Sequence, residues 1–88
     1  MSVKALAWAY RQTTLHPYEK LILLFLADVE MGHEEYSEFP PNKSIQSYAN
    51  LSETQIKTAL SSLRDQGFID ILHKENSVTY FRIGLRHG

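Results

Sequence analysis

The stretch NLSETQIKTALSSLRDQGFI, residues 50–69, contains every signal needed to define one amphipathic helix. Ser52 and Gln55 have the spacing of a capping box, in which the first side chain accepts a backbone N–H and the second bonds back to the cap. Gly67 stands where a left-handed residue closes many helices. Apolar residues recur at helical spacing, at Ile56, Ala59, Leu60 and Leu63. We therefore predict a helix from about 52 to 66 with that face in the core.

The opposite face of this predicted helix is small and polar. Its centre contains Thr54, Thr58, Ser61 and Asp65, with Lys57 and Arg64 along one border and Gln55 and Ser62 along the other. Hydroxyl groups and lysine can bond to base edges in the major groove of DNA. An ordinary solvated helix face has the same composition, so the helix alone leaves both interpretations open.

The surrounding sequence predicts the other elements. Residues 3–12 favour a short helix, and residues 17–31 favour an apolar central helix that begins at Pro17. A polar segment with a short strand at 36–39 precedes a helix from Lys43 to Ala49, which should end at Asn50. Ile45, Tyr48 and Ala49 should face inward in that helix. Two runs of alternating residues, 68–74 and 78–84, predict a hairpin.

This order of elements is that of a helix-turn-helix followed by a β-hairpin wing. We expect a mainly α fold with a β-hairpin wing, a winged helix-turn-helix: a three- to four-helix bundle plus a two- or three-stranded sheet. Residues 1–88 should form one domain. In such an arrangement the helix at 52–66 enters the major groove and the hairpin tip approaches a phosphate.

The candidate DNA contacts follow from this geometry. For bases or the groove they are Thr54, Gln55, Lys57, Thr58 and Ser61. For phosphate and the wing they are Lys43, Ser52, Arg64, His73, Lys74 and Asn76. Because Gln55 also belongs to the predicted capping box, its side chain is shared between the end of the helix and DNA.

Three segments carry a resemblance to a known family: SVKALAWAYRQ, HPYEKLILLFLAD and PPNKSIQSYANLSETQIKTALSSLRDQGFI. Together they resemble the winged helix-turn-helix domains at the front of phage and plasmid replication initiation proteins and related regulators. The resemblance implies a helical bundle with a β-wing and duplex DNA as partner, with replication or transcription proteins as further partners. Family members often have Arg or Lys at the two positions after the turn serine, where this chain has Glu53 and Thr54.

The overall charge is compatible with DNA binding despite its sign. The net charge is −1, but five of the ten acidic residues lie between Asp28 and Glu38, a segment without Lys or Arg. The rest of the chain therefore has nine basic residues against five acidic ones, a net charge of +4. This asymmetry permits a basic face opposite an acidic loop.

Composition argues against other classes of function. The chain has no cysteine, its four histidines are scattered without metal-ligand spacing, and no glycine-rich phosphate loop is present. We therefore expect no metal, no cofactor and no enzyme. The longest apolar run, residues 21–27, is too short to span a membrane, and the first ten residues do not form a signal peptide. A cytoplasmic protein is expected.

Two alternatives remain open. The chain could be a winged-helix module that binds proteins and not DNA; a common face for Lys43, Lys57, Arg64, Lys74 and Arg82 would argue against this. A homodimer could also form through the helix at 3–12, by way of an exposed Trp8 or Tyr10. It would present two recognition helices to half-sites about 34 Å apart.

Overall fold

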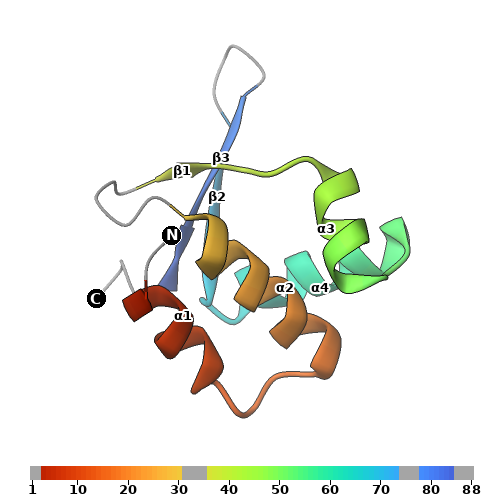
Figure 1. Cartoon of the computed structure of the whole chain (residues 1–88). Helices are drawn as coiled ribbons and strands as arrows, with labels where there is room; N and C mark the ends of the chain where they lie inside the picture. Colours follow the sequence, from red (N-terminus) through yellow and green to blue (C-terminus); the bar gives the residue numbers. More distant parts are fainter. Residues whose placement is uncertain (1–2, 31–35, 74–77, 85–88) are drawn as a thin grey trace.

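The computed structural model describes residues 3–30, 36–73 and 78–84, which form four helices and three strands. The helices are α1 (Val3–Tyr10), α2 (Pro17–Val29), α3 (Asn42–Ala49) and α4 (Glu53–Asp65). The strands are β1 (Ser37–Glu38), β2 (Ile69–His73) and β3 (Thr79–Ile83). The predicted class is confirmed: the described chain has the helix and strand order of a winged helix-turn-helix (Figure 1).

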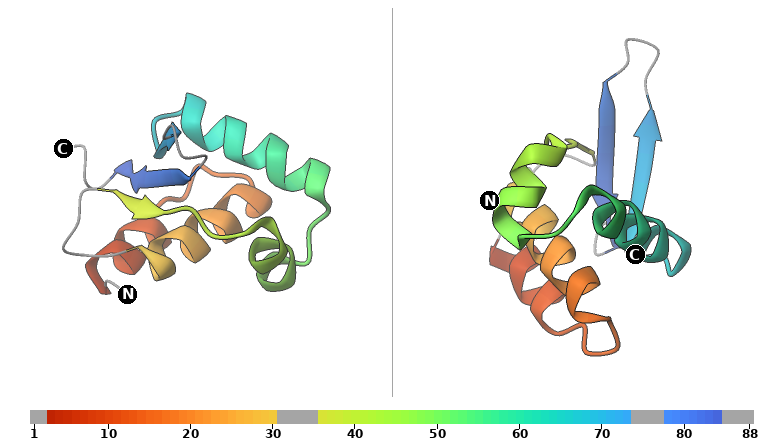
Figure 2. Two further views of the ribbon diagram at one scale, coloured as in Figure 1. Left: turned by 90° about the horizontal axis from the view of Figure 1, so that it is seen from above. Right: turned by 90° about the vertical axis from the view of Figure 1, so that its right-hand side faces the viewer.

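The three strands form one antiparallel sheet with the order β1-β3-β2. Strand β3 is central, with Ile71 of β2 and Ser37 of β1 opposite Phe81. Phe81 and Ile83 are fully buried, so one face of the sheet closes the helical core. Figure 2 shows strands β2 and β3 extending beyond the helices, as the strands of a wing do.

Helix α2 is the centre of the core, as predicted. Its residues Ile22, Leu23 and Leu26 are completely buried, and α1, α3 and α4 all pack against this one helix. Ile56 and Leu63 of α4 belong to the same buried cluster. The orientation of α4 is therefore set mainly by its packing on α2.

The end of α4 has the geometry of a Schellman motif. Gly67 has a φ of 83°, and its N–H donates to the Arg64 carbonyl at 3.1 Å. The N–H of Phe68 donates to the Leu63 carbonyl at 2.9 Å. This reversal leads the chain directly into β2 and confirms the role predicted for Gly67.

A second glycine allows the last strand to approach this turn. The N–H of Gly84 donates to the Phe68 carbonyl at 2.7 Å. A Cβ atom on Gly84 would stand 3.0 Å from the Gly67 carbonyl oxygen and 3.1 Å from the Trp8 ring. The close contact between α1, the end of α4 and the end of β3 therefore requires a residue without a side chain.

Some predicted details differ from the structure. The first helix ends at Tyr10 and the second at Val29, each two residues earlier than expected. Tyr48 was predicted to face inward but is 47% exposed, because the two turns of α3 bury only Ile45 and Ala49. The Tyr48 ring lies at the edge of the core against Phe25, with the ring centroids 4.9 Å apart.

We predict that Gly67→Ala lowers the free energy of unfolding by about 1–2 kcal/mol, the cost of placing an ordinary residue in the left-handed conformation. The space around Gly67 is open, so the added methyl group meets no neighbour. Gly67→Asn is the matched control and should lose less, since asparagine adopts this conformation more readily. Urea unfolding of the three proteins measures the difference; equal losses for Ala and Asn would contradict the conformational explanation.

Candidate nucleic-acid interface

A tight turn joins α3 to α4 and fixes the angle between them. Asn50 ends α3 in the left-handed conformation with a φ of 56°, as predicted, and its N–H donates to the Gln46 carbonyl at 2.8 Å. Leu51 follows and belongs to the same buried core cluster as Ile56, which lies one turn into α4. These two buried residues occupy the positions of a hydrophobic staple, which fixes the direction in which the chain enters α4.

The predicted capping box at the start of α4 is present. The Gln55 N–H donates to Ser52 Oγ at 3.2 Å, and the Ser52 N–H donates to Gln55 Oε1 at 2.9 Å. Both side chains, predicted as DNA contacts, thus have a structural role at this helix end. The Ser52 hydroxyl hydrogen and the Gln55 amino group are donors that these two bonds do not use.

The outward face of α4 carries short side chains and no excess of charge. Thr54, Thr58 and Ser61 are all exposed, as predicted. Lys57 Nζ lies 3.6 Å from Glu53 Oε1, and both side chains are largely exposed, at 72% and 61%. The helix has two acidic and two basic residues in total. It therefore presents hydrogen-bonding groups with little attraction for phosphate.

The basic residues proposed for one face are only partly brought together. Lys57 and Arg64 are seven residues apart on α4 and share an exposed side of it, and Lys43 is exposed in the first turn of α3. His73 is exposed at the end of β2, where its Nδ1 lies 3.3 Å from Thr79 Oγ1. Lys74 and Asn76, predicted in the wing tip, lie outside the described residues.

Arg82 has a role within the sheet. Its Nη2 lies 3.3 Å from Asp70 Oδ2, and its guanidinium carbon is 4.8 Å from the centre of the Tyr36 ring. The Tyr36 hydroxyl donates to the same Asp70 oxygen at 3.2 Å. Because only 20% of the Arg82 side chain is exposed, this cluster joins β2 and β3 to the segment before β1 and adds little to a basic surface.

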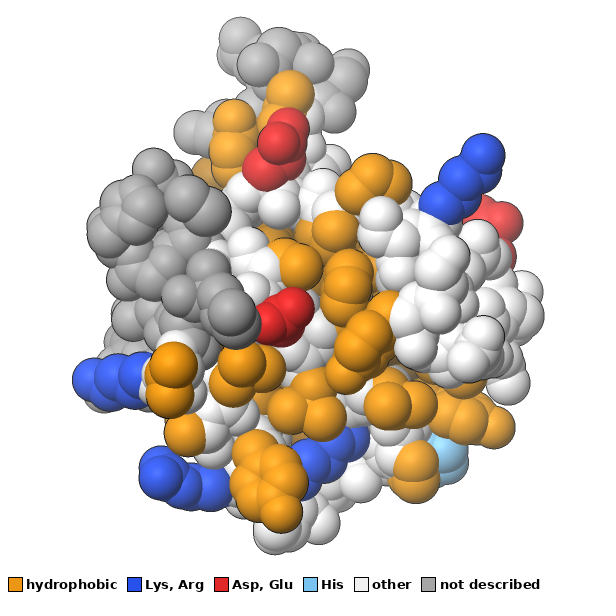
Figure 3. Space-filling model, viewed as in Figure 1, with side chains coloured by type: hydrophobic (Ala, Val, Ile, Leu, Met, Phe, Trp, Pro, Cys, Tyr) orange, Lys and Arg blue, Asp and Glu red, His pale blue; other side chains and the backbone are white. Residues whose placement is uncertain are grey.

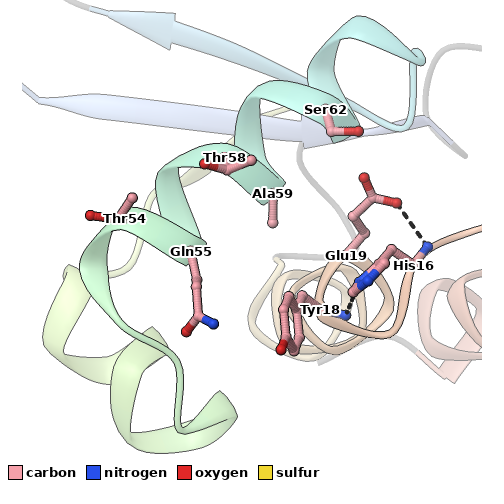
Figure 4. Close-up of a pocket in the computed structure, with 8 residues that line it drawn as sticks. All are labelled: His16, Tyr18, Glu19, Thr54, Gln55, Thr58, Ala59 and Ser62. Carbon is pink, nitrogen blue, oxygen red and sulfur yellow. Dashed lines mark hydrogen bonds between the residues drawn. The ribbon is translucent and has the colours of Figure 1, made fainter.

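A cavity of about 380 Å³ lies beside the polar face of α4, between this helix and the start of α2 (Figure 4). Gln55 and Ala59 point into it from α4, and the rings of His16 and Tyr18 form the opposite wall. Neither ring is among the site residues predicted from the sequence. The cavity extends the surface of α4 sideways onto a second helix.

An unusual cap holds the start of α2 at this cavity. The Tyr18 N–H donates to His16 Nδ1 at 3.3 Å, and the His16 N–H donates to Glu19 Oε1 at 2.9 Å. The available signal was Glu19 at the third helical position, two residues after Pro17, but histidine is not among the preferred capping residues. The start of this helix can therefore be predicted from the sequence, but its cap cannot.

Glu19 links the start of α2 to α4. A hydrogen bond from the Ser62 side chain is the largest cause of a lowered pKa for this carboxyl group, and the His16 N–H also lowers it, while burial opposes both. Ser62 Oγ in turn accepts from Gln66 Nε2 at 2.9 Å. The cavity therefore has an ionised carboxylate on its wall, which makes it a poor site for a phosphate group.

Other kinds of site find no support in the part of the chain that the structure covers. Within it, no group of three or more His, Cys, Asp or Glu residues is placed to hold a metal ion. The described helices include none with the length and apolar character needed to cross a membrane.

Comparison with known proteins agrees with this geometry. A family model described as a helix-turn-helix domain matches residues 13–69, from just before α2 to the first residue of β2. The match covers well over half of the chain and includes α2, α3 and α4. No curated protein and no solved structure matches the chain.

We predict that the contact between Glu19 and Ser62 makes the protein sensitive to acid. Because the pKa of Glu19 is lowered below its ordinary 4.5, the contact stabilises the fold above about pH 4.5, and this contribution is lost as the pH falls through the lowered value. Glu19→Gln and Ser62→Ala should therefore both reduce the loss of stability between pH 7 and pH 3. Urea unfolding at several pH values tests this; an unchanged pH dependence in both variants would show that the contact does not form in solution.

Proposed function

The chain belongs to the helix-turn-helix domain family, and from this premise we propose that it binds double-stranded DNA with α4 in the major groove. The family suggests DNA as the partner. Beyond DNA as the partner, we propose which helix enters the groove, which residues contact DNA and what the biological role is. We also propose that residues 1–88 act as one domain.

The observation that carries the proposal is the outward face of α4. Thr54, Thr58 and Ser61 are exposed along a helix that is fixed at both ends, by the capping box and by the turn at Gly67. Short side chains let a helix backbone approach the base pairs closely, and their hydroxyl groups can bond to several bases. We assign base or groove contacts to these three residues, to Lys57 and to the unused amino group of Gln55.

Phosphate contacts would come from residues around α4. We propose Arg64 near its end, Lys43 on α3, Ser52 at the turn and His73 on the wing, with Lys74 and Asn76 of the wing tip as further contacts. Lys57 can leave Glu53 at little cost, because an exposed ion pair of this kind contributes only about 0.3–0.5 kcal/mol. Phosphate contacts would position the helix, whereas base contacts would give it specificity.

The biological role proposed is replication initiation or transcription regulation in a phage, plasmid or mobile element. It rests on the resemblance of residues 2–12, 16–28 and 40–69 to the DNA-binding domains of such proteins. We infer a cytoplasmic, non-enzymatic protein that brings replication or transcription proteins to a DNA site.

One observation favours a second candidate, a winged-helix module that binds proteins. The charges on α4 cancel, and its lysine is paired with Glu53, so the helix lacks the basic excess that supplies most non-specific affinity for DNA. Salt-dependent DNA binding distinguishes the two functions.

We predict that the full 88-residue protein binds duplex DNA with an affinity that falls as salt rises, and that Lys57→Ala weakens this binding. If Lys57 contacts a base, the loss should be about 1–3 kcal/mol on the specific site only. If it contacts phosphate, the loss should be equal on all DNA sequences. The slope of the logarithm of affinity against the logarithm of salt concentration should then fall in magnitude by about 1. Fluorescence anisotropy across a salt series measures both quantities.

Lys4→Ala is the matched control for this experiment, since Lys4 is an exposed lysine on α1, which packs on α2 and not on the outward face of α4. It should bind as the wild type does. Absence of wild-type binding even at low salt would overturn the proposal and favour the protein-binding module.

We predict that Glu53→Gln strengthens binding to every duplex sequence. The substitution removes a negative charge from the DNA-facing side of α4 and frees Lys57. The protein itself should lose about 0.3–1 kcal/mol of stability, because an acid at the first position of a helix interacts favourably with its dipole. The control is Glu38→Gln on β1, and equal gains in affinity for the two variants would indicate a general charge effect and no contact through α4.

A further inference from the structure

The side of the molecule formed by α1 and α2 has an open apolar groove. It has a volume of about 600 Å³ and is lined by Val3, Leu6, Ala7, Tyr10, Arg11 and Leu24. Val3 is 81% exposed and Tyr10 is 73% exposed. Figure 3 shows hydrophobic side chains gathered over α1 and α2 on this face. Exposed apolar residues scattered singly need no explanation, but a groove lined by five apolar side chains is a candidate contact surface.

The apolar character of α1 exceeds what its own packing needs. Only Ala5 and Ala9 of this helix are fully buried, on the side that meets α2. The other side, with Val3, Leu6 and Tyr10, is also apolar. A helix that is apolar on both sides is stable in water when both are covered. Among the described residues, the core covers the side with Ala5 and Ala9 and partly buries Leu6 on the other side, where Val3 and Tyr10 remain exposed.

Charged side chains of both signs lie near the groove. Arg11 lines one end, immediately after α1. Asp28 is exposed one helical turn beyond Leu24 on the same side of α2. Because α2 returns alongside α1 after a short connection (Figure 1), Asp28 lies toward the opposite end from Arg11. In an antiparallel contact between two copies, Arg11 of one copy would therefore lie near Asp28 of the other, with Lys4, which is exposed one turn before Ala7 on α1, at the same end as Asp28.

We propose that this groove binds a second copy of the chain, forming a two-fold symmetric dimer. In an isologous contact each surface meets itself in reverse, so Arg11 of each copy faces Asp28 of the other. The two charge pairs enclose a shared apolar centre formed by Val3, Leu6, Tyr10 and Leu24. A membrane or a simple apolar ligand would use the apolar centre but would leave the charged side chains near the groove unexplained.

In this dimer the two α4 helices lie on opposite outer sides of the assembly. Helices α1 and α4 both pack on α2 and lie on opposite sides of it, as Figure 2 shows. Two copies joined through the groove therefore direct their α4 helices away from each other. This step rests on the proposed function, DNA binding through α4: the dimer then holds two separate segments of duplex DNA. The sequence instead predicts that a dimer would bind adjacent half-sites.

Sedimentation of the full 88-residue chain tests the dimer without DNA, across concentrations up to about 100 μM because dimerisation follows mass action. Val3→Glu, Arg11→Glu and Asp28→Arg should each weaken dimerisation at least about tenfold. The double variant Arg11→Glu, Asp28→Arg should recover most of the loss, since it restores the pairs with their charges exchanged. A monomer at all concentrations, or no recovery in the double variant, overturns the proposal.

Two controls separate loss of the dimer from loss of the fold. Glu38→Arg makes the same charge change on β1, outside the groove, and should leave dimerisation unchanged. Val3 is highly exposed and lies in the first turn of α1, where an acid is compatible with the helix, so Val3→Glu should keep the wild-type circular dichroism and melting curve. Equal weakening by Glu38→Arg would overturn the assignment of the groove.

The second test addresses the two-sided arrangement. An immobilised duplex loaded with wild-type protein should capture a second, labelled duplex, whereas the Val3→Glu variant should bind the first duplex without capturing the second. A stable dimer that binds one duplex and captures no other overturns the outward arrangement of α4. Failure of the protein to bind any DNA would instead count against the proposed function, and the sedimentation result would still stand for the dimer.

Discussion

The packing of α4 against α2 is the interaction on which the rest of the structure depends. Ile22 and Leu26 of α2 and Ile56 and Leu63 of α4 are all essentially inaccessible to water, and burial of side chains of this size contributes about 1.5–3 kcal/mol each. A chain of 88 residues has room for one such core, so each other element must also reach it. Helices α1 and α3 pack on α2 directly, and β3 closes the core with Phe81.

Packing alone would leave α4 free to slide or rotate, and short-range contacts remove that freedom. The capping box and the buried Leu51 fix its first turn, while Gly67 reverses the chain after its last. Glu19 and Ser62 then connect the start of α2 to the last turn of α4 from the side. A helix held in this way presents its outward side chains with little freedom, which is what selective hydrogen bonding to another surface requires.

Features that depend on neighbours in sequence could be predicted from sequence, and features that depend on the fold could not. The cap at Ser52, the left-handed residues Asn50 and Gly67, and the outward face of α4 all follow from spacing within a few residues. The Arg82 cluster could not be found this way, because Asp70 and Tyr36 come from distant parts of the chain. Likewise, the sequence places His16 and Glu19 together but gives no sign that Ser62 lies beside them.

The absence of net charge on α4 connects DNA recognition with self-association. A helix with balanced charges gains little from phosphate attraction, so a single copy would bind DNA mainly through hydrogen bonds and would dissociate readily. Joining two copies changes this, because the second contact becomes intramolecular once the first has formed and the overall affinity rises without any new kind of contact. With the α4 helices on opposite sides, this gain applies to two segments of one DNA molecule that can approach each other. Weak single contacts and the proposed outward-facing dimer would therefore together favour binding to DNA segments that are held in pairs.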